Sequence, residues 1–572
     1  MRQPKRPKNQ TTNLLFLLLT FTLSLTAQDL DYRAPLNGPL LVTGTFGELR
    51  SDHFHAGLDF RAKTNTPVYN VADGFVSRIV ISPGGYGQAV YVDHPDGHRS
   101  VYAHLETLRT ELLDTVRARQ FAEEKFRQDL RFDSTAFPLK RGDKIGGVGN
   151  RGHSFGSHLH FEMRDAATDA ALNPLAFGFS IPDTRAPQIR NLRVYELDNH
   201  GLEHDVQTFK IAERRGRYSA PDTIVVGSPR VGLALKAYDR QNAMPNWNGI
   251  YGGELYADTT RIFDFRFARI PFEETEYLNA LTDYEEWNKN TAWYHRFWAL
   301  TQDAMFLETA MDDETYDGSL RLLPNRPLPV RMLVNDQAGN VSEISFALVY
   351  RPQERAPLAR PHQYFLPAGE GSIIDNGAMR FELDSNALYR DLFFRYAQLP
   401  DASAGHVSPT HQLHDGFTPL HGHGKLSIRP DQPVADSLRD RVFLGKCQHD
   451  GQWSGNGGDW TPDGRFRANV YSFGDYALFL DTIPPQVKIN YFATDLRRGA
   501  GFSLLITDNV QGALQYRGTI NGEWVLLEYD IKNDKLTYSF RDGDPGPGNH
   551  RFVIEVVDGR GNWTTWERKF RR

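Results

Sequence analysis

Residues 149–162 read Gly149-Asn150-Arg151-Gly152-His153-Ser154-Phe155-Gly156-Ser157-His158-Leu159-His160-Phe161-Glu162, and they carry the strongest structural signal in the chain. A glycine-rich turn leads into an alternating run that predicts a β-strand. Residues two apart on a strand project from one face, so we expect His158 and His160 to share a cleft, with Leu159 in the core. Two such imidazoles can bind a metal, or one can bind it while the other moves protons. An isolated His-x-His pair more often does neither, so the pair alone assigns no function.

Two segments earlier in the chain supply further candidate ligands. They are His55-Ala56-Gly57-Leu58-Asp59 and Tyr102-Ala103-His104-Leu105. Two histidines and one carboxylate leave the fourth position of a tetrahedral zinc open for water, as in catalytic sites. One aspartate against Zn²⁺ leaves a net charge of about +1, which lowers the pKa of that water and polarises a scissile carbonyl. A helical His-x-x-x-Asp pair is the competing geometry for the first segment, and Gly57 argues against it.

The three segments occur in order within one glycine-rich region, and together they resemble the lysostaphin-like M23 metallopeptidase family over about residues 44–175. The turns Gly85-Tyr86-Gly87 and 149–154 also match the family's pattern. The resemblance implies a small, mainly antiparallel β domain with a narrow groove. It implies that zinc is held by His55, Asp59 and His160, and that His104 and His158 are catalytic. The implied substrate is a peptide crosslink or stem of bacterial peptidoglycan.

The implied reaction is metal-assisted hydrolysis with one histidine as general base. We assign that role to His158, and the stabilisation of the oxyanion or proton transfer to the leaving amine to His104; the reverse assignment is also open. Glu162 either orients a ligand imidazole or is a solvent-facing strand residue. Tyr86 either contacts substrate or covers the edge of the core.

Composition excludes several other classes of protein. The 572 residues carry a formal net charge of -6 and no strongly basic block beyond the N-terminus, so nucleic acid is not an expected partner. Cys447 is the only cysteine, which excludes internal disulfides and a zinc site built on several thiolates.

The N-terminus reads as a secretory signal peptide over residues 1–27. Four basic residues precede an apolar run from Leu14 to about Leu25 and a small residue, Ala27. The run is shorter than the roughly 20 residues of a membrane span, so we expect no transmembrane span in the mature chain and export to the periplasm or cell surface. An uncleaved N-terminal anchor is the alternative.

The chain is expected to be mainly β, with a catalytic domain at 28–180. Leu112, Val116, Phe126 and Leu130 share one face at helical spacing and predict a helical insertion over about 106–138. This region is longer than usual for the family and is a candidate lid over the groove.

An internal repeat organises the remainder of the chain. The opener Asp183-Thr184-Arg185-Ala186-Pro187 resembles Asp481-Thr482-Ile483-Pro484-Pro485, and each is followed later by a strand with a terminal aspartate, Asp336 or Asp558, and a Gly-Asn turn. These patterns predict immunoglobulin-like β-sandwiches at 181–352, with insertions, and at 481–572, with a β-rich unit at 353–480 between them.

Three function classes follow from this reading. The first is a zinc endopeptidase of peptidoglycan, the second a zinc peptidase of protein substrates, and the third a dormant protein that binds and activates other wall hydrolases. The C-terminal β domains are candidates for binding a protein partner or glycan. Trp453 and Trp460, set among glycines, form either a sugar-stacking platform or part of a packed sandwich.

Overall fold

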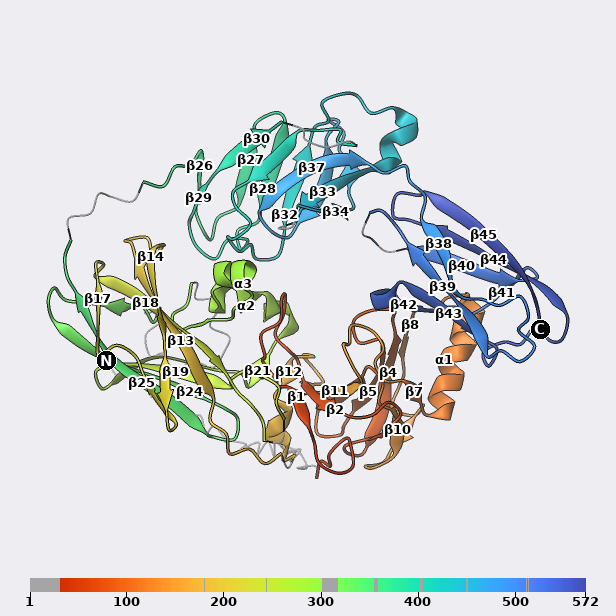
Figure 1. Ribbon diagram of the computed structural model, residues 1–572, viewed down its shortest axis with the longest axis horizontal. Helices are drawn as coiled ribbons and strands as arrows, with labels where there is room; N and C mark the ends of the chain where they lie inside the picture. The colour runs from red at the N-terminus through yellow and green to blue at the C-terminus, as the bar shows by residue number, and fades with distance from the viewer. Residues whose placement is uncertain are drawn as a thin grey trace, which may run out of the picture.

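The computed structural model describes residues 31–179, 181–242, 244–300, 317–353, 359–400, 405–448, 451–510, 512 and 514–572. The expected signal peptide, residues 1–27, lies outside the described residues. The fold is mainly β, as predicted, with 46% strand and 9% helix. Four β units follow one another around a central opening (Figure 1). No helix in these ranges combines the length and the apolar character that crossing a membrane requires.

The amino-terminal unit is built on one large antiparallel sheet and one small one. The large sheet has the order β1-β2-β11-β6-β5-β4-β8, with β9 and β12 at its sides, and the small sheet has the order β3-β10-β7. The strands are β1 (Val42–Gly44), β2 (Leu58–Arg61), β3 (Pro67–Tyr69), β4 (Gly74–Ile81), β5 (Gln88–Asp93), β6 (His98–Ala103), β7 (Thr107–Leu108), β8 (Gln128–Arg131), β9 (Pro138–Leu139), β10 (Lys144–Gly147), β11 (His158–Asp165) and β12 (Ala171–Leu172). A short 3₁₀ helix, η1 (Pro174–Phe177), follows.

Strand β11 is the central strand of this unit and begins at the His-x-His pair. It pairs with β2 on one side and β6 on the other, and its middle six residues are buried. Leu159 and Phe161 enter the core, whereas His160 and Glu162 lie on the opposite face. The alternation read from the sequence therefore sets which side chains reach the site.

The helix of the insertion is shorter than predicted. Helix α1 spans Thr110–Glu123 and ends where Glu124 adopts a left-handed conformation. The residues after it form β8, which pairs with β4, so Phe126 and Leu130 are not helical and the predicted face extends only to Leu112 and Val116. A strand in this position adds an edge to the large sheet, and that pairing overrides the helical spacing.

The second unit is a β-sandwich that continues the core of the first. Its sheets have the orders β14-β13-β18-β22, with β23 beside β18, and β17-β25-β24-β19-β20. Strand β21 (Arg269–Ile270) pairs with β12 and so extends the large sheet of the first unit. The other elements are β13 (Gln188–Leu197), β14 (Glu203–Lys210), β15 (Ala212–Arg214), β16 (Arg217–Ser219), β17 (Thr223–Val226), β18 (Arg230–Tyr238), β19 (Gly252–Ala257), β20 (Thr260–Arg266), η2 (Phe272–Tyr277), α2 (Leu278–Leu281), α3 (Tyr284–Asn290), β22 (His295–Arg296), β23 (Leu320–Arg321), β24 (Pro327–Asn335) and β25 (Val341–Tyr350).

The third unit has its own core between two five-stranded sheets. Their orders are β27-β28-β32-β36-β35 and β30-β31-β37-β33-β34, with the separate pair β26-β29. The elements are β26 (Tyr364–Leu366), β27 (Ser372–Asp375), β28 (Met379–Leu383), β29 (Leu392–Phe394), β30 (Tyr396–Leu399), β31 (Thr410–Leu413), β32 (Gly424–Ile428), η4 (Asp436–Arg441), β33 (Val442–Cys447), β34 (Trp453–Asn456), β35 (Asp459–Trp460), β36 (Phe466–Val470) and β37 (Gly474–Leu480).

The fourth unit is a sandwich of two four-stranded sheets around a third core. The sheet orders are β38-β39-β43-β42 and β41-β40-β44-β45. The elements are β38 (Gln486–Tyr491), β39 (Gly501–Thr507), β40 (Gln515–Ile520), β41 (Glu523–Trp524), β42 (Glu528–Asp530), η5 (Ile531–Asn533), β43 (Lys535–Ser539), β44 (Asn549–Val557) and β45 (Trp563–Arg571).

The last unit returns to the first and closes the ring (Figure 1). Helix α1 lies against the fourth unit, where Phe121 meets Trp524 edge-on with ring centroids 5.3 Å apart. Arg117 of α1 also donates to Glu528 at 2.7 Å. The insertion therefore docks the C-terminal sandwich onto the first unit.

Both tryptophans considered as a sugar platform are engaged by neighbouring side chains. The ring of Trp453 lies 4.9 Å from that of Phe479. Trp460 donates its indole N–H to the carbonyl of Arg439, whose guanidinium lies over the ring at 4.2 Å. This geometry favours the packed-sandwich interpretation for both residues.

Candidate metal centre and catalytic site

The pairing register of β11 with β2 brings His160 and Asp59 together. The two residues are direct partners across the strands, and His160 Nδ1 lies 2.9 Å from Asp59 Oδ1. On the other side of β2, Asp59 faces Gly44, where a side chain would lie 2.5 Å from the carboxylate. Glycine at position 44 therefore leaves the space that the carboxylate occupies.

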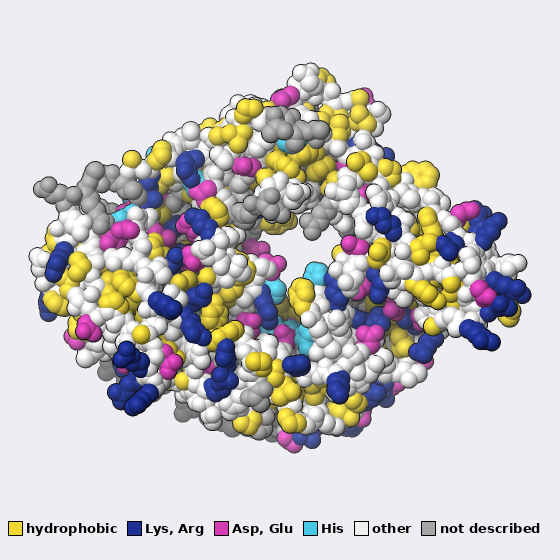
Figure 2. Space-filling view, viewed as in Figure 1, with side chains coloured by type: hydrophobic (Ala, Val, Ile, Leu, Met, Phe, Trp, Pro, Cys, Tyr) yellow, Lys and Arg dark blue, Asp and Glu magenta, His cyan; other side chains and the backbone are white. Residues whose placement is uncertain are grey.

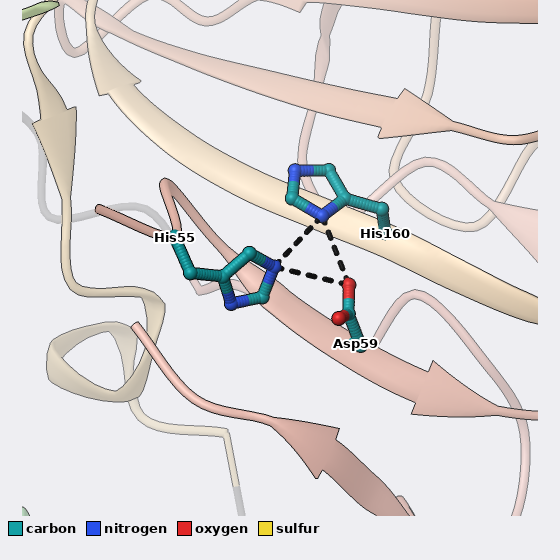
Figure 3. Close-up of side chains that lie close together, drawn as sticks. All are labelled: His55, Asp59 and His160. Carbon is teal, nitrogen blue, oxygen red and sulfur yellow. Dashed lines mark hydrogen bonds and ion pairs between the residues drawn. The ribbon is translucent and has the colours of Figure 1, made fainter. Parts of the chain in front are cut away.

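His55 reaches the same point from the segment before β2. Its Nδ1–H donates to the carbonyl of Thr45 at 2.8 Å, which leaves the lone pair of Nε2 facing inward. Gly57 allows this approach, because a Cβ there would lie 2.3 Å from the carbonyl oxygen of Phe161. Figure 3 shows the three side chains converging, with dashed lines between their donor atoms.

The donor set fits a zinc ion. His55 Nε2 lies 3.1 Å from His160 Nδ1 and 3.1 Å from Asp59 Oδ1. A tetrahedral zinc with bonds of 2.0–2.1 Å separates its ligand atoms by about 3.4 Å, close to these distances. In their neutral forms both imidazoles present lone pairs to the centre, and a cation relieves the repulsion between those lone pairs. Two nitrogens and one carboxylate oxygen are ligands that zinc prefers.

A buried network fixes the orientation of His160. Its Nε2–H donates to Glu162 Oε1 at 2.8 Å, which leaves Nδ1 as the ligand atom. Glu162 is fully buried and also accepts from Tyr86 at 2.5 Å and Arg164 at 2.5 Å. Of the two interpretations of Glu162, the structure favours the orienting one. Tyr86 packs at the edge of a buried cluster and also lines the groove, so its contact with substrate stays a prediction.

The network shifts the pKa values of its members. Burial opposes the charged form of His160, but hydrogen bonds from its ring to Asp59 and Glu162 outweigh burial and raise its pKa to about 9. Burial likewise opposes the charge on Glu162, but Arg164 and His160 lower its pKa to about 2. Metal binding at Nδ1 of His160 therefore displaces a proton.

The two other histidines flank the three ligands, and each is held through Nδ1. His104 donates to the carbonyl of Arg151 at 2.7 Å, and His158 donates to that of Gly156 at 2.8 Å. His158 Nε2 lies 3.6 Å from Asp59 Oδ1, and the rings of His104 and His158 have centroids 4.9 Å apart. His104 adopts a left-handed backbone conformation with φ of 58°, which only a few per cent of non-glycine residues adopt.

Burial keeps both of these imidazoles neutral. Desolvation, with nearby His160 and His158, lowers the pKa of His104 to about 3. Desolvation also lowers the pKa of His158, against the opposing influence of Asp59. A neutral ring whose Nδ1 carries the proton offers an acceptor at Nε2.

All five predicted residues line one groove of about 1530 Å³. The second unit contributes Asn246, Phe272 and Thr275 to its wall, whereas helix α1 contributes nothing to its described lining. Histidine side chains gather at the inner rim of the central opening (Figure 2). The insertion therefore does not cover the groove as the lid hypothesis expected.

Residues 53–121 match the family model described as Peptidase family M23. The chain carries an M23 peptidase domain. The M23 domain is 30% identical over 135 residues to the DD-carboxypeptidase/endopeptidase Mpg of Neisseria meningitidis serogroup B, covering 24% of this chain and 25% of that protein. It is 31% identical over 134 residues to the cell division protein DipM of Caulobacter vibrioides, covering 23% of this chain and 18% of that protein. The chain thus spans a quarter or less of the length of these relatives.

Two further comparisons concern structure and the third unit. The solved catalytic domain of the prophage-encoded M23 protein EnpA of Enterococcus faecalis is 27% identical and covers 25% of this chain and 97% of that one, with a TM-score of 0.19. Residues 363–481, the third β unit, match a Zu5-like domain model.

Several residues around the M23 site were not identified from the sequence. Arg50 lies 3.3 Å from the second carboxylate oxygen of Asp59, and Arg164 neutralises Glu162. Arg164 follows Glu162 by two positions on one strand, so the alternation of side chains could have predicted that both lie on the same face. Arg50 lies in an irregular segment, where no periodicity predicts its direction.

Proposed function

We propose that this chain is a zinc-dependent endopeptidase that hydrolyses peptide stems or crosslinks of bacterial peptidoglycan. The observation that supports this most directly is the convergence of His55 Nε2, Asp59 Oδ1 and His160 Nδ1 within about 3 Å of one another on the floor of a groove. His55, Asp59 and His160 would hold the zinc, and the bound ion would supply a Lewis acid for the scissile carbonyl and an acidified water.

The flanking histidines carry the proton transfers in this proposal. His158 accepts the proton of the attacking water at Nε2, because its Nδ1–H is held by Gly156 and its Nε2 faces the ligand carboxylate. His104 is held in the same way by Arg151, and its ring centroid lies 5.8 Å from that of His160. His104 takes the proton at its own Nε2 from His158, whose ring centroid lies 4.9 Å from its own, and passes it to the leaving amine.

The groove suits an extended, anionic peptide. Phe155 is fully exposed at its rim, at 104% of the reference area, and offers an apolar contact. Arg61 and Lys63 are exposed along the lining and offer charge to substrate carboxylates, which peptidoglycan stems carry. The relatives named as an endopeptidase and a cell division protein support this substrate class.

The proposed location is the periplasm or the cell surface, to which residues 1–27 would direct the chain as a signal peptide before they are removed.

The function is tested on isolated sacculi. These would be digested with the purified chain, and the released muropeptides compared with those from His160→Ala and from chelator-treated protein. We expect new unlinked stem peptides only from the zinc-loaded wild type, which would also identify the bond.

The other function classes give different results in the same assay. A peptidase of protein substrates would cleave casein and leave sacculi intact. A dormant activator would release nothing alone and would fail to retain zinc through dialysis. Either result would overturn the proposed function.

A further inference from the structure

The two repeated sandwiches each contain a cluster of three aspartates remote from the M23 site. In the second unit the cluster is Asp183, Asp239 and Asp336, and in the fourth it is Asp481, Asp508 and Asp558. In each cluster, one oxygen from every carboxylate lies within 4.8 Å of the others. The first aspartate belongs to the repeated opener, and the other two each follow the end of a strand.

Buried carboxylate oxygens without a partner point to a ligand at both clusters. Asp239 is 1% exposed and Asp481 is 2% exposed, yet Asp239 Oδ1 and Asp481 Oδ2 lack a hydrogen bond. Asp183 Oδ2 and Asp508 Oδ1 are also without a partner. Native proteins satisfy nearly all buried polar atoms, so two such oxygens in each of two clusters require an explanation.

The contacts that shape the clusters are duplicated from one sandwich to the other. Asp336 accepts from the backbone and side-chain nitrogens of Asn340, both at 2.8 Å, and Asp558 accepts from those of Asn562 at 2.9 and 2.8 Å. Each asparagine also donates to the carbonyl of the opener aspartate, at 3.2 Å in the second unit and 3.1 Å in the fourth.

The two opener aspartates also share a hydrogen bond to the backbone. Asp183 Oδ1 accepts from the backbone N–H two residues later at 3.1 Å, and Asp481 Oδ1 does the same at 3.2 Å. In both cases the other oxygen is the one without a partner. The same donors and the same unpartnered oxygen therefore occur twice, although the spacing between opener and last aspartate differs between the sandwiches.

No arginine or lysine neutralises these clusters within the ranges described. None of the six carboxylates forms an ion pair there; their donors are backbone N–H groups and side-chain amides. Burial and the neighbouring aspartates raise the pKa of Asp239 to about 7 and that of Asp508 to about 6. Like charges held this closely are costly without a counter-ion.

We infer that each cluster binds one calcium ion, so that the chain holds two structural Ca²⁺ ions in addition to its catalytic metal. Calcium prefers ligand sets made only of oxygen and tolerates irregular geometry with six to eight donors. Zinc sites include nitrogen or sulfur ligands, which these clusters lack, and magnesium requires a near-ideal octahedron. Carboxylates from a linker and two strand ends provide an irregular, oxygen-only site.

Each ion would link the segment that leads into a sandwich to the ends of two strands of that sandwich. Asp481 directly follows β37 of the third unit, and Asn562 accepts a hydrogen bond from Arg441 of that unit at 2.6 Å. Asp183 lies between the M23 domain and β13. Calcium would therefore stiffen two junctions of the ring.

The test counts calcium in the full-length chain. Protein treated with chelator and reloaded with one equivalent of zinc is dialysed against radioactive calcium chloride. We expect two ions per chain with a Kd of about 10⁻⁴–10⁻³ M, as in extracellular modules, and a Tm rise of roughly 4–8 °C in 10 mM calcium. Magnesium chloride at the same concentration should give a smaller rise; an equal rise would overturn the assignment to calcium.

Two isosteric variants make the test specific. Asp239→Asn and Asp508→Asn should each reduce the count from two ions to one, and the double variant should bind none. Without calcium, each variant should have a Tm at or above that of the wild type, because a negative charge has left the cluster. His160→Ala and the exposed Asp495→Asn are controls that should retain two ions. No binding by the wild type, or an unchanged count in the double variant, would overturn the inference.

Discussion

Arg151 Nη1 lies 2.8 Å from Oε2 of Glu528, a residue 377 positions further along the chain. The same arginine accepts the Nδ1–H of His104 through its carbonyl oxygen. The fourth unit thus contacts the loop that holds a proposed catalytic histidine. Lys532, also in the fourth unit, adds hydrogen bonds to the carbonyl oxygens of Asn150 and Ser154 in this loop.

Glu528→Gln should reduce kcat by about ten-fold with little change in KM. Loss of the charge weakens the contact that holds the Arg151 loop, so the ring of His104 is positioned less well. Small displacements of catalytic groups slow the reaction strongly. Steady-state kinetics on a soluble crosslinked peptide would measure the change, with zinc content and Tm as checks on folding.

The matched control for Glu528 is Arg517→Gln. Arg517 pairs with Glu124 at 2.6 Å across the same interface, but both side chains are about half exposed, so this pair contributes little. Equal losses of kcat in both variants would show that docking in general matters rather than the contact with Arg151.

Asp59→Asn should abolish zinc retention through dialysis and, with it, activity. The carboxylate supplies one ligand and the only negative charge among the three candidate ligands, and an amide is a weak substitute. Metal analysis of dialysed protein is the measurement. Asp52→Asn is the control, because Asp52 lines the same groove with an 80% exposed side chain. Full zinc retention by Asp59→Asn would remove Asp59 from the ligand set.

Glu162→Gln should weaken zinc binding by about 10–100-fold, as is typical when the partner of a ligand histidine is changed. The amide no longer attracts the Nε2–H of His160 as a charge does, and buried Arg164 loses its nearest counter-ion. Competition with a chromogenic chelator gives the affinity. Tyr86→Phe removes one hydrogen bond to Glu162 and one from Arg164 but leaves the charge of Glu162 in place, so it should have a smaller effect; the reverse order would contradict this account of the network.

Phe155→Ala should raise KM about three- to ten-fold and leave kcat nearly unchanged. The ring is fully exposed, and none of the described contacts joins it to a proposed metal ligand. It can therefore bind the substrate equally in the ground state and in the transition state. Initial rates over a range of peptide concentrations separate the two constants. A fall in kcat at constant KM would assign Phe155 a role in the chemical step.

Acid should destabilise the second unit through His295. Burial lowers the pKa of this ring to about 4, whereas an unfolded histidine titrates near 6.5. The unfolded chain therefore binds the proton first, and roughly 3 kcal/mol of stability present above pH 6.5 is lost as the pH falls to 4.

Urea unfolding of the wild type and of His295→Phe at pH 7 and pH 4.5 would test this loss. Phenylalanine can keep the stack on Phe265, whose ring plane lies within 13° of that of His295. The variant should lose less stability than the wild type between the two pH values. His362→Gln, at an exposed histidine, is the control, and a similar loss in all three proteins would contradict the assignment to His295.

The local part of the M23 site could be predicted from the sequence. Alternation along β11 places His158 and His160 on one face because a strand repeats every two residues. The same rule predicts that Glu162 follows on that face. Helical spacing along the insertion predicted a longer helix than α1, and that prediction was wrong, because the pairing of β8 with β4 is a contact between distant segments.

What the sequence by itself determined was the set of candidate ligands and the β character of the units, since both depend on residue type and short-range periodicity. Tertiary structure alone decided that Glu528 holds the Arg151 loop and that Asp239 and Asp508 join the repeated aspartates. Those relations depend on sheet register and on how whole units pack. Residues that meet only through packing have no common spacing along the chain, so no local pattern specifies them.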